Sequence, residues 1–312
     1  MHVAEPHYGA RTWRIGTVPV DDLTQRLLVM KALDRRMASG IESLDRQEIS
    51  AFPVEGLGAV RLIDQSRGIW NPRSLDATLT ILSSPDGPYG DEEIAPGVWI
   101  YHYRAGSKDG DNRKLRRAFE LQVPLIMWRK IANGVFIPIY PVYITGDDEE
   151  ARTFTVALDE VRHLGPPDVM SVDARRYAEQ IVRRRLHQPE FRGRVLRAYT
   201  RHCTVCKLES VQLLDAAHIV GDAHDLGEAT VRNGLAMCKI HHAAYDANLL
   251  GISPDKIVHI NRELLQTIDG PMLEHGLKDM HLKPLMWSPS ARADQPDPDR
   301  LALRFEEFAA AG

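Results

Sequence analysis

The chain has 312 residues, of which 44% are hydrophobic and 26% charged, and its formal net charge is −4. This balance excludes a disordered chain and an evenly basic nucleic-acid coat, while a local basic face stays compatible with it. Apolar runs stay below the ~20 residues that cross a bilayer, and the N-terminus has no signal-peptide pattern. We therefore expect a cytoplasmic protein of one or two domains with no membrane partner.

The first predicted element is a helix that starts at Asp21 and ends at Gly40, because apolar residues recur between them at helical spacing. Residues 51–158 instead predict short strands separated by turns. The expected strands are Ala59–Ile63, Ala77–Leu82, Val98–Tyr103, Pro124–Ile131, Val135–Ile144 and Phe154–Leu158. Asn133-Gly134 predicts a hairpin between two of them, and one helix is expected at Arg113–Glu120. This region therefore predicts one mainly β domain, as a curved sheet or an open barrel.

A domain boundary is predicted at Gly165-Pro166-Pro167, and an arginine-rich helical segment, interrupted at Gln188-Pro189, follows from Val172 to about His202. A last helix is expected at Arg300–Ala311. The predicted fold class is α+β. We expect an N-terminal mainly β domain (1–165), a helical linker (166–190), a compact C-terminal domain (191–290) and a tail (291–312).

All three cysteines of the chain lie in one short window, together with a histidine. Cys203-x2-Cys206 and Cys238-x2-His241 are two knuckles, and a two-residue gap lets both side chains of a knuckle reach one tetrahedral ion. An odd number of cysteines argues against a disulfide framework. The spacing therefore predicts a closed structural zinc site formed by three thiolates and one imidazole.

Between the knuckles, a predicted strand carries His218, and Asn233 comes before the second knuckle. His242 follows His241 on a predicted helix, so that one histidine can bind zinc while the other faces His218. Asp246 shares the helix face of His242 at i, i+4 spacing. A neutral histidine that takes a proton from water, beside a hard divalent ion, suits phosphodiester hydrolysis.

Residues 190–252 resemble the HNH (ββα-metal) nucleases. The resemblance lies in C-x2-C, A-A-H-I, N-G-L-A-M-C-x2-H-H and Y-D. It implies that the domain at 191–290 is a zinc-stabilised HNH nuclease with His218 as general base, Asn233 as the loop-fixing asparagine and His242 as ligand of a catalytic Mg²⁺ or Mn²⁺. Many relatives have an aspartate directly before the base, where this chain has Ala217. Asp215 and Asp246 are the candidates to replace that metal ligand.

The arginines before Cys203 are either a solvated helix face or contacts to DNA phosphates, and Arg192 and Arg197 are the candidate contacts. In the N-terminal domain, aromatic, amide and basic residues gather around predicted loops. They could hold an extruded base, by stacking and by hydrogen bonds to its edge. The alternative is an ordinary core with a capped helix starting at Asn112. The candidates are Trp70, Tyr101, Tyr103, Asp111, Asn112 and Arg113.

The domain order resembles modification-dependent restriction endonucleases, which join an SRA-like domain of the PUA superfamily to a C-terminal HNH nuclease. The N-terminal likeness rests on a Y-x-Y-R strand followed by D-N-R. It implies cleavage of double-stranded DNA that carries 5-methylcytosine or a related base. Two alternatives stay open: an HNH nuclease with another trigger, in phage defence or in repair, and a zinc-stabilised DNA-binding module without catalysis. Because one HNH site cuts one strand, a homodimer is a further expectation.

Overall fold

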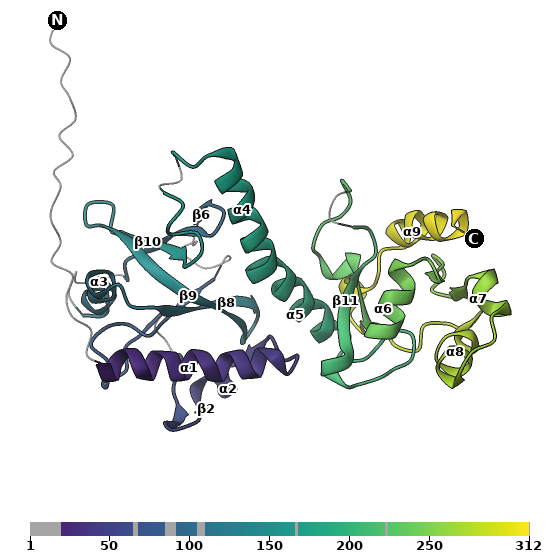
Figure 1. Cartoon of the computed structure of the whole chain (residues 1–312), viewed down its shortest axis with the longest axis horizontal. Coiled ribbons are helices and arrows are strands. Elements are labelled where there is room, and N and C mark those ends of the chain that lie inside the picture. Colours follow the sequence, from purple (N-terminus) through teal and green to yellow (C-terminus); the bar gives the residue numbers. More distant parts are fainter. Residues whose placement is uncertain are drawn as a thin grey trace, which may run out of the picture. The chain divides into compact units, whose positions relative to one another are not determined.

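A computed structural model describes residues 20–64, 68–84, 92–104, 110–165, 168–221 and 224–311 (Figure 1). The described residues form two compact units. The first unit takes its residues from 20–32, 46–129 and 139–179, and the second from 33–45, 130–138 and 180–311. Part of the boundary predicted at Gly165-Pro166-Pro167 lies outside the described residues. The contiguous division expected from the sequence stays a prediction.

An eight-stranded sheet forms the core of the N-terminal half, with strand order β4-β5-β8-β9-β10-β7-β6 and β1 paired to β9. β5 and β8 run parallel, whereas β10 lies antiparallel between β7 and β9. β8 and β9 flank Asn133-Gly134, as the hairpin signal predicted. The strands are β1 (Leu44–Asp45), β4 (Ile69–Trp70), β5 (Thr80–Ser83), β6 (Glu92–Ala95), β7 (Val98–His102), β8 (Leu125–Ala132), β9 (Val135–Asp148) and β10 (Thr153–Leu158).

Two main helices and a small hairpin accompany this sheet. Helix α1 (Val20–Ala38) begins in the first unit, where the buried Arg26 pairs with Asp22 and donates to the carbonyls of Ala77, Thr78 and Pro124. Because a buried guanidinium needs acceptors for its donors, these bonds fix α1 against the start of β5 and β8. The other elements are α2 (Arg46–Ser50), β2 (Phe52–Val54), β3 (Gly58–Val60) and α3 (Asp111–Leu121).

The arginine-rich segment forms one helical run with a widened turn in its middle. α4 (Val172–Val182) continues through a π-helical turn, η1 (Arg183–His187), into α5 (Gln188–Ala198). Pro189 lies two residues after the end of this turn, and a proline has no N–H and crowds the preceding turn of a helix. The interruption predicted at Gln188-Pro189 is therefore a widened turn within a continuous helical run.

The second unit is built around a small hairpin and a helix that lie side by side in Figure 1. β11 (Leu214–His218) pairs antiparallel with β12 (Gly234–Cys238), and α6 (Lys239–Asp246) follows. Asp297 caps the last helix, α9 (Pro298–Ala310). The remaining elements are η2 (Val211–Leu213), η3 (Val231–Asn233), β13 (Leu250–Ile252), β14 (Val258–Ile260), α7 (Arg262–Gln266), α8 (Pro271–Gly276), η4 (Lys278–Met280) and η5 (Arg292–Asp294).

The α+β class predicted from the sequence is confirmed, with a β-rich N-terminal region, an arginine-rich helical run and a small mixed C-terminal unit. Among the described residues, no helix combines the length and the hydrophobicity that a bilayer crossing requires.

Candidate functional site

The four predicted zinc ligands converge in the second unit. One donor atom each from Cys203, Cys206, Cys238 and His241 lies within 4.8 Å of the others. The Nδ1 atom of His241 is 3.1 Å from the Cys238 Sγ and 3.6 Å from the Cys203 Sγ. The cluster can therefore hold one metal ion, and three sulfurs with one imidazole nitrogen suit zinc.

A backbone contact orients the histidine of this cluster. The Nε2 of His241 lies 2.7 Å from the carbonyl oxygen of Gly276 in α8. With Nε2–H donating to that carbonyl, Nδ1 is left as the acceptor that faces the thiols, which is the tautomer a metal ligand needs. Cys203 and Cys238 are buried within the apolar core of the unit. An ion at this site would therefore link β12 and α6 to the loop after α5, which carries Cys203 and Cys206.

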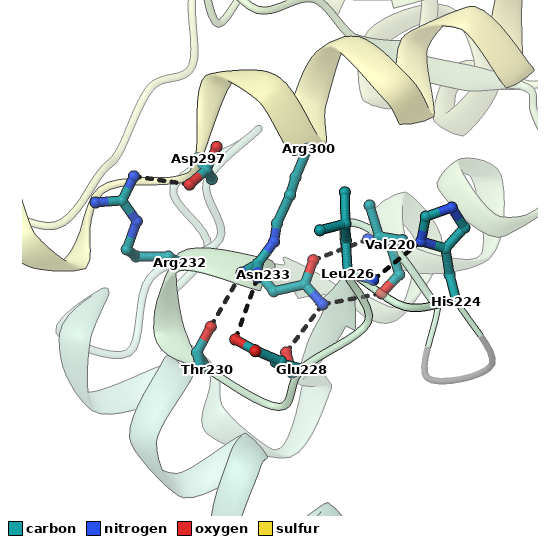
Figure 2. A network of polar contacts seen from close by, with 9 residues as sticks. All are labelled: Val220, His224, Leu226, Glu228, Thr230, Arg232, Asn233, Asp297 and Arg300. Carbon is teal, nitrogen blue, oxygen red and sulfur yellow. Dashed lines mark hydrogen bonds and ion pairs between the residues drawn. The ribbon is translucent and has the colours of Figure 1, made fainter.

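Asn233 closes the loop that follows His218. Its amide Oδ1 accepts from the backbone N–H of Val220 at 2.9 Å, and its Nδ2 donates to the carbonyls of Val220 (2.9 Å) and Glu228 (3.0 Å). Figure 2 shows the amide between these partners, with Arg300 of α9 reaching the Glu228 side chain. Asn233 is fully buried, so the three bonds hold both ends of the loop beside the strand.

A close approach between helix α5 and the hairpin explains the glycine after Asn233. Gly234 lies opposite His218 in the β11–β12 pair. A Cβ atom on Gly234 would lie 2.4 Å from Cγ2 of Val195, which is too close for any side chain at position 234. The same helix supplies Phe191, whose ring stacks on the His218 imidazole with centroids 3.9 Å apart and planes 9° apart. Helix α5 therefore sets the plane of the imidazole.

His218, His242 and Asp215 line one pocket of about 570 Å³ in the second unit. The Nδ1 of His242 is 3.5 Å from Oδ2 of Asp215, and its Nε2 is 3.3 Å from Oδ2 of Asp246. The two carboxylates thus face opposite edges of one imidazole ring. Ala217, the position where many relatives have an aspartate, is completely buried in the core.

The charges in this pocket perturb one another. Hydrogen bonding to Asp215, together with the nearby carboxylate of Asp246, raises the pKa of His242 against the opposing effect of burial. Burial raises the pKa of Asp215, but His242, the backbone N–H of Ala216 and the charge of Arg192 together lower it by more, so its net pKa lies below the usual range. Asp215 is therefore ionised and His242 is drawn toward its charged form at neutral pH.

The two arginines predicted to contact DNA lie in different surroundings. Arg192 is mostly buried, with 13% of its side chain exposed, and its guanidinium contacts backbone carbonyls and carboxylates. Arg197 is exposed on α5. Two further cations, Arg184 and Lys239, line the pocket and are exposed. Sequence reasoning did not single these two out, because nothing in a run of arginines tells which members face a particular pocket.

In the first unit, the predicted base-contacting aromatic residues are packed into the fold. Tyr101 and Tyr103 are buried, and Trp70 donates its indole N–H to the carbonyl of Arg61 at 2.7 Å. Tyr101 donates to the carbonyl of Gly68 at 3.0 Å. Burial and a hydrogen bond to Asp147 raise the pKa of Tyr103 to about 12. Each of these polar groups thus already has a protein partner.

Two of the predicted D-N-R residues contact Arg104, Asn112 through the backbone of Arg104 and Asp111 through its side chain. The Asn112 side chain accepts from the Arg104 N–H at 2.9 Å and donates to the Arg104 carbonyl at 3.1 Å. Asp111 pairs with the Arg104 side chain and accepts from Asn71 at 3.0 Å, whereas Arg113 is exposed. Helix α3 begins at Asp111 with Gly110 at the N-cap, and Asn112 bonds to the Arg104 backbone and does not cap the helix.

Residues 203–253 match a family model described as HNH endonuclease (HNH_2). One similar solved structure is the modification-dependent TagI restriction endonuclease, with 15% identity over 84% of this chain and 90% of that chain, and a TM-score of 0.30. A SUVH5 SRA complex with methylated CHH DNA has 17% identity over 46% and 93%, with a TM-score of 0.29. The phosphorothioation-dependent restriction endonuclease ScoMcrA has 15% identity over 58% and 51%, with a TM-score of 0.23.

The comparison with curated proteins gives no significant match. The family match spans the Cys3His donors, the β11–β12 hairpin and α6, which together form the geometry described above. It confirms the HNH resemblance seen in the sequence. The chain therefore contains an HNH endonuclease domain at residues 203–253.

Proposed function

We propose that the chain is a modification-dependent DNA endonuclease that hydrolyses a phosphodiester bond near 5-methylcytosine or a related base. The observation that carries the catalytic part is one pocket that is lined by His218, Asp215 and His242 inside the HNH unit. A base, a carboxylate and a second imidazole around one cavity are the groups that hydrolysis of a phosphodiester needs.

In this proposal His218 is the general base. Its imidazole takes a proton from a water molecule, whose oxygen attacks phosphorus while the bond between phosphorus and the leaving oxygen breaks. The leaving alkoxide then takes a proton from solvent, and His218 releases its proton to solvent, so that protons and charge balance. The stacked ring of Phe191 holds the imidazole plane during this transfer. Asn233 keeps the loop after His218 in place through its three hydrogen bonds.

Asp215 and His242 are the residues that would hold the catalytic Mg²⁺ or Mn²⁺. Their facing oxygen and nitrogen are 3.5 Å apart, close to the ~3 Å that separates neighbouring ligands of an octahedral ion with ~2.1 Å bonds. Such an ion polarises the phosphate and stabilises the leaving oxygen. Asp246 faces the other edge of the ring, so we place it as the group that orients His242.

The Cys3His cluster holds the structural zinc in this proposal. All four donors come from the protein, which leaves no position for substrate and separates this site from the catalytic one. His241 and His242 are neighbours on α6, so the helix joins the structural ion to the catalytic pocket.

Exposed cations at the pocket favour a nucleic-acid substrate. Arg184 and Lys239 line the pocket, and Arg197 is exposed on the same helical run as Arg184. Arginine and lysine side chains supply sequence-independent affinity by neutralising backbone phosphates. We propose Arg184 and Lys239 as the contacts that seat the scissile strand, with Arg197 as a further backbone contact.

The modification-reading role of the first unit rests on its sequence resemblance to SRA-like domains and on its mainly β fold. The proposed contacts to an extruded base are Trp70, Tyr101, Tyr103, Asp111, Asn112 and Arg113. Because both tyrosines are buried, a base could reach them only if the adjoining loops open. A nuclease with another trigger is the alternative, and the substrate experiment below separates the two.

The test is digestion of matched plasmids that carry no modification, 5-methylcytosine or 5-hydroxymethylcytosine, in Mg²⁺ and in Mn²⁺. Cutting restricted to a modified plasmid supports the proposal, whereas equal cutting of all three refutes modification dependence. His218→Ala should abolish cutting while the zinc content stays unchanged, and undiminished cutting refutes the base assignment. The ratio of nicked to linear product tests whether both strands are cut, and its dependence on protein concentration tests whether a homodimer cuts them.

A further inference from the structure

We propose that Arg192 is a positioning residue of the nuclease site, which fixes Asp215 and ties it to the segment Gly40–Glu42. This inference rests on the proposed catalytic role of Asp215. The family match begins at residue 203, so both Arg192 and Gly40–Glu42 lie outside it.

Each of the three nitrogens of the Arg192 guanidinium contacts a protein oxygen. The Nε faces Oδ1 of Asp215 at 3.4 Å. One terminal nitrogen contacts the Gly40 carbonyl at 3.0 Å and the Glu42 carboxylate at 3.3 Å. The other donates to the carbonyls of Val211 at 3.3 Å and Leu214 at 2.9 Å. Three of these contacts are hydrogen bonds to backbone carbonyls and two are ion pairs. Because only 13% of the side chain is exposed, the guanidinium is directed into the protein and away from a DNA phosphate.

These contacts determine which oxygen of Asp215 is available. Oδ1 forms an ion pair with the Arg192 Nε and accepts a hydrogen bond from the backbone N–H of Ala216 at 3.0 Å. Oδ2 is then the oxygen that faces His242. A carboxylate that is held through one oxygen presents the other oxygen in a fixed direction. Groups that contact metal ligands commonly orient the ligands in this way. Arg192 also pins the start of β11 through the Val211 and Leu214 carbonyls.

The segment around Gly40 completes this arrangement. Gly40 has φ = +80°, and a Cβ atom on it would lie 3.0 Å from the Cα of Gln212. Only glycine allows this approach, which brings the Gly40 carbonyl and the Glu42 carboxylate to Arg192. Gly40 and Glu42 line the same pocket as His218. The end of helix α1 and the turn after it therefore form one wall of the nuclease pocket.

The experiment titrates Mn²⁺ into the full-length protein and measures both DNA cleavage and Mn²⁺ binding by calorimetry. Arg192→Gln should raise the Mn²⁺ concentration for half-maximal cleavage by about 10–100-fold and weaken Mn²⁺ binding equally. DNA affinity without added divalent ion should stay unchanged. Arg184→Gln should do the opposite, with weaker DNA binding, a smaller salt dependence and an unchanged Mn²⁺ requirement.

Arg194→Gln is the matched control, since Arg194 lies on the same helix and pairs with Glu190 at 2.5 Å, away from the pocket. It should leave both readouts unchanged. If Arg192→Gln unfolds, Arg192→Lys keeps the charge without the planar fork, and a folded Lys variant with a normal Mn²⁺ requirement overturns the inference. So does an Arg192→Gln variant that loses DNA affinity as Arg184→Gln does.

Asp215→Asn separates this inference from the proposed function. If Asp215→Asn leaves Mn²⁺ binding and cleavage unchanged, the proposed catalytic site is wrong. If Asp215→Asn raises the Mn²⁺ requirement while Arg192→Gln does not, only the positioning role of Arg192 is wrong.

Discussion

Replacing Asn233 with alanine tests how strongly the loop after His218 is held. The substitution removes three hydrogen bonds from a fully buried amide and leaves the Val220 N–H and two carbonyls without their partner. At about 1 kcal/mol for each bond, the free energy of unfolding should fall by about 3 kcal/mol. For a unit of this size we expect the melting temperature to fall by about 6–12 °C.

The assay is calorimetric unfolding together with a cleavage time course and zinc analysis. Asn233→Ala should cut more slowly while it retains zinc, because the amide contacts no member of the Cys3His cluster. Glu228→Ala is the control: it keeps the backbone carbonyl that Asn233 uses and removes only a 3.3 Å ion pair between an exposed carboxylate and Arg300. Such surface pairs contribute about 0.5 kcal/mol. An Asn233→Ala variant as stable as Glu228→Ala would refute this account of the loop.

Three further substitutions test the same unit. Cys206→Ser should release the bound zinc and destabilise the C-terminal unit, and full zinc retention in metal analysis would contradict the cluster. Gly234→Ala forces a Cβ atom against Val195 and should cost about 1–3 kcal/mol of stability in a denaturant titration, so a neutral effect would contradict the close approach. Asp215 raises the pKa of His242. Without a metal ion, the Asp215–His242 ion pair therefore stabilises the fold fully below pH ~6.5, and this stabilisation is lost as the pH rises through the raised pKa of His242. A metal ion needs the neutral ring, so apparent Mn²⁺ affinity should rise with pH in the wild type, while His242→Asn should remove this slope.

Local patterns predicted the parts of the fold that depend on neighbouring residues. The cysteine and histidine spacing predicted a four-donor cluster because each knuckle is a single turn, and its donors do converge. The i, i+4 spacing predicted that Asp246 and His242 meet on α6, and they lie 3.3 Å apart. Asn133-Gly134 predicted a hairpin and Pro189 predicted an altered helical turn, because both signals depend only on neighbouring residues.

Contacts between distant segments could not be predicted in this way. Arg192 contacts a carbonyl 152 positions away in the sequence, and a run of arginines gives no sign of which member turns inward. The ring stack of Phe191 on His218 likewise depends on how α5 packs across the hairpin. One local expectation also differed in detail, because Asn112 bonds to Arg104 and does not cap α3.

The interleaved composition of the second unit matters for anyone building chimeric enzymes. Its chain comes from three stretches, 33–45, 130–138 and 180–311, so the first unit is in effect inserted into it at two places. A graft that moves only the residues after Gln180 onto a foreign DNA reader would leave Gly40 and Glu42 behind. Exchange of the first unit should therefore succeed only when the donor scaffold brings equivalents of those short stretches with it.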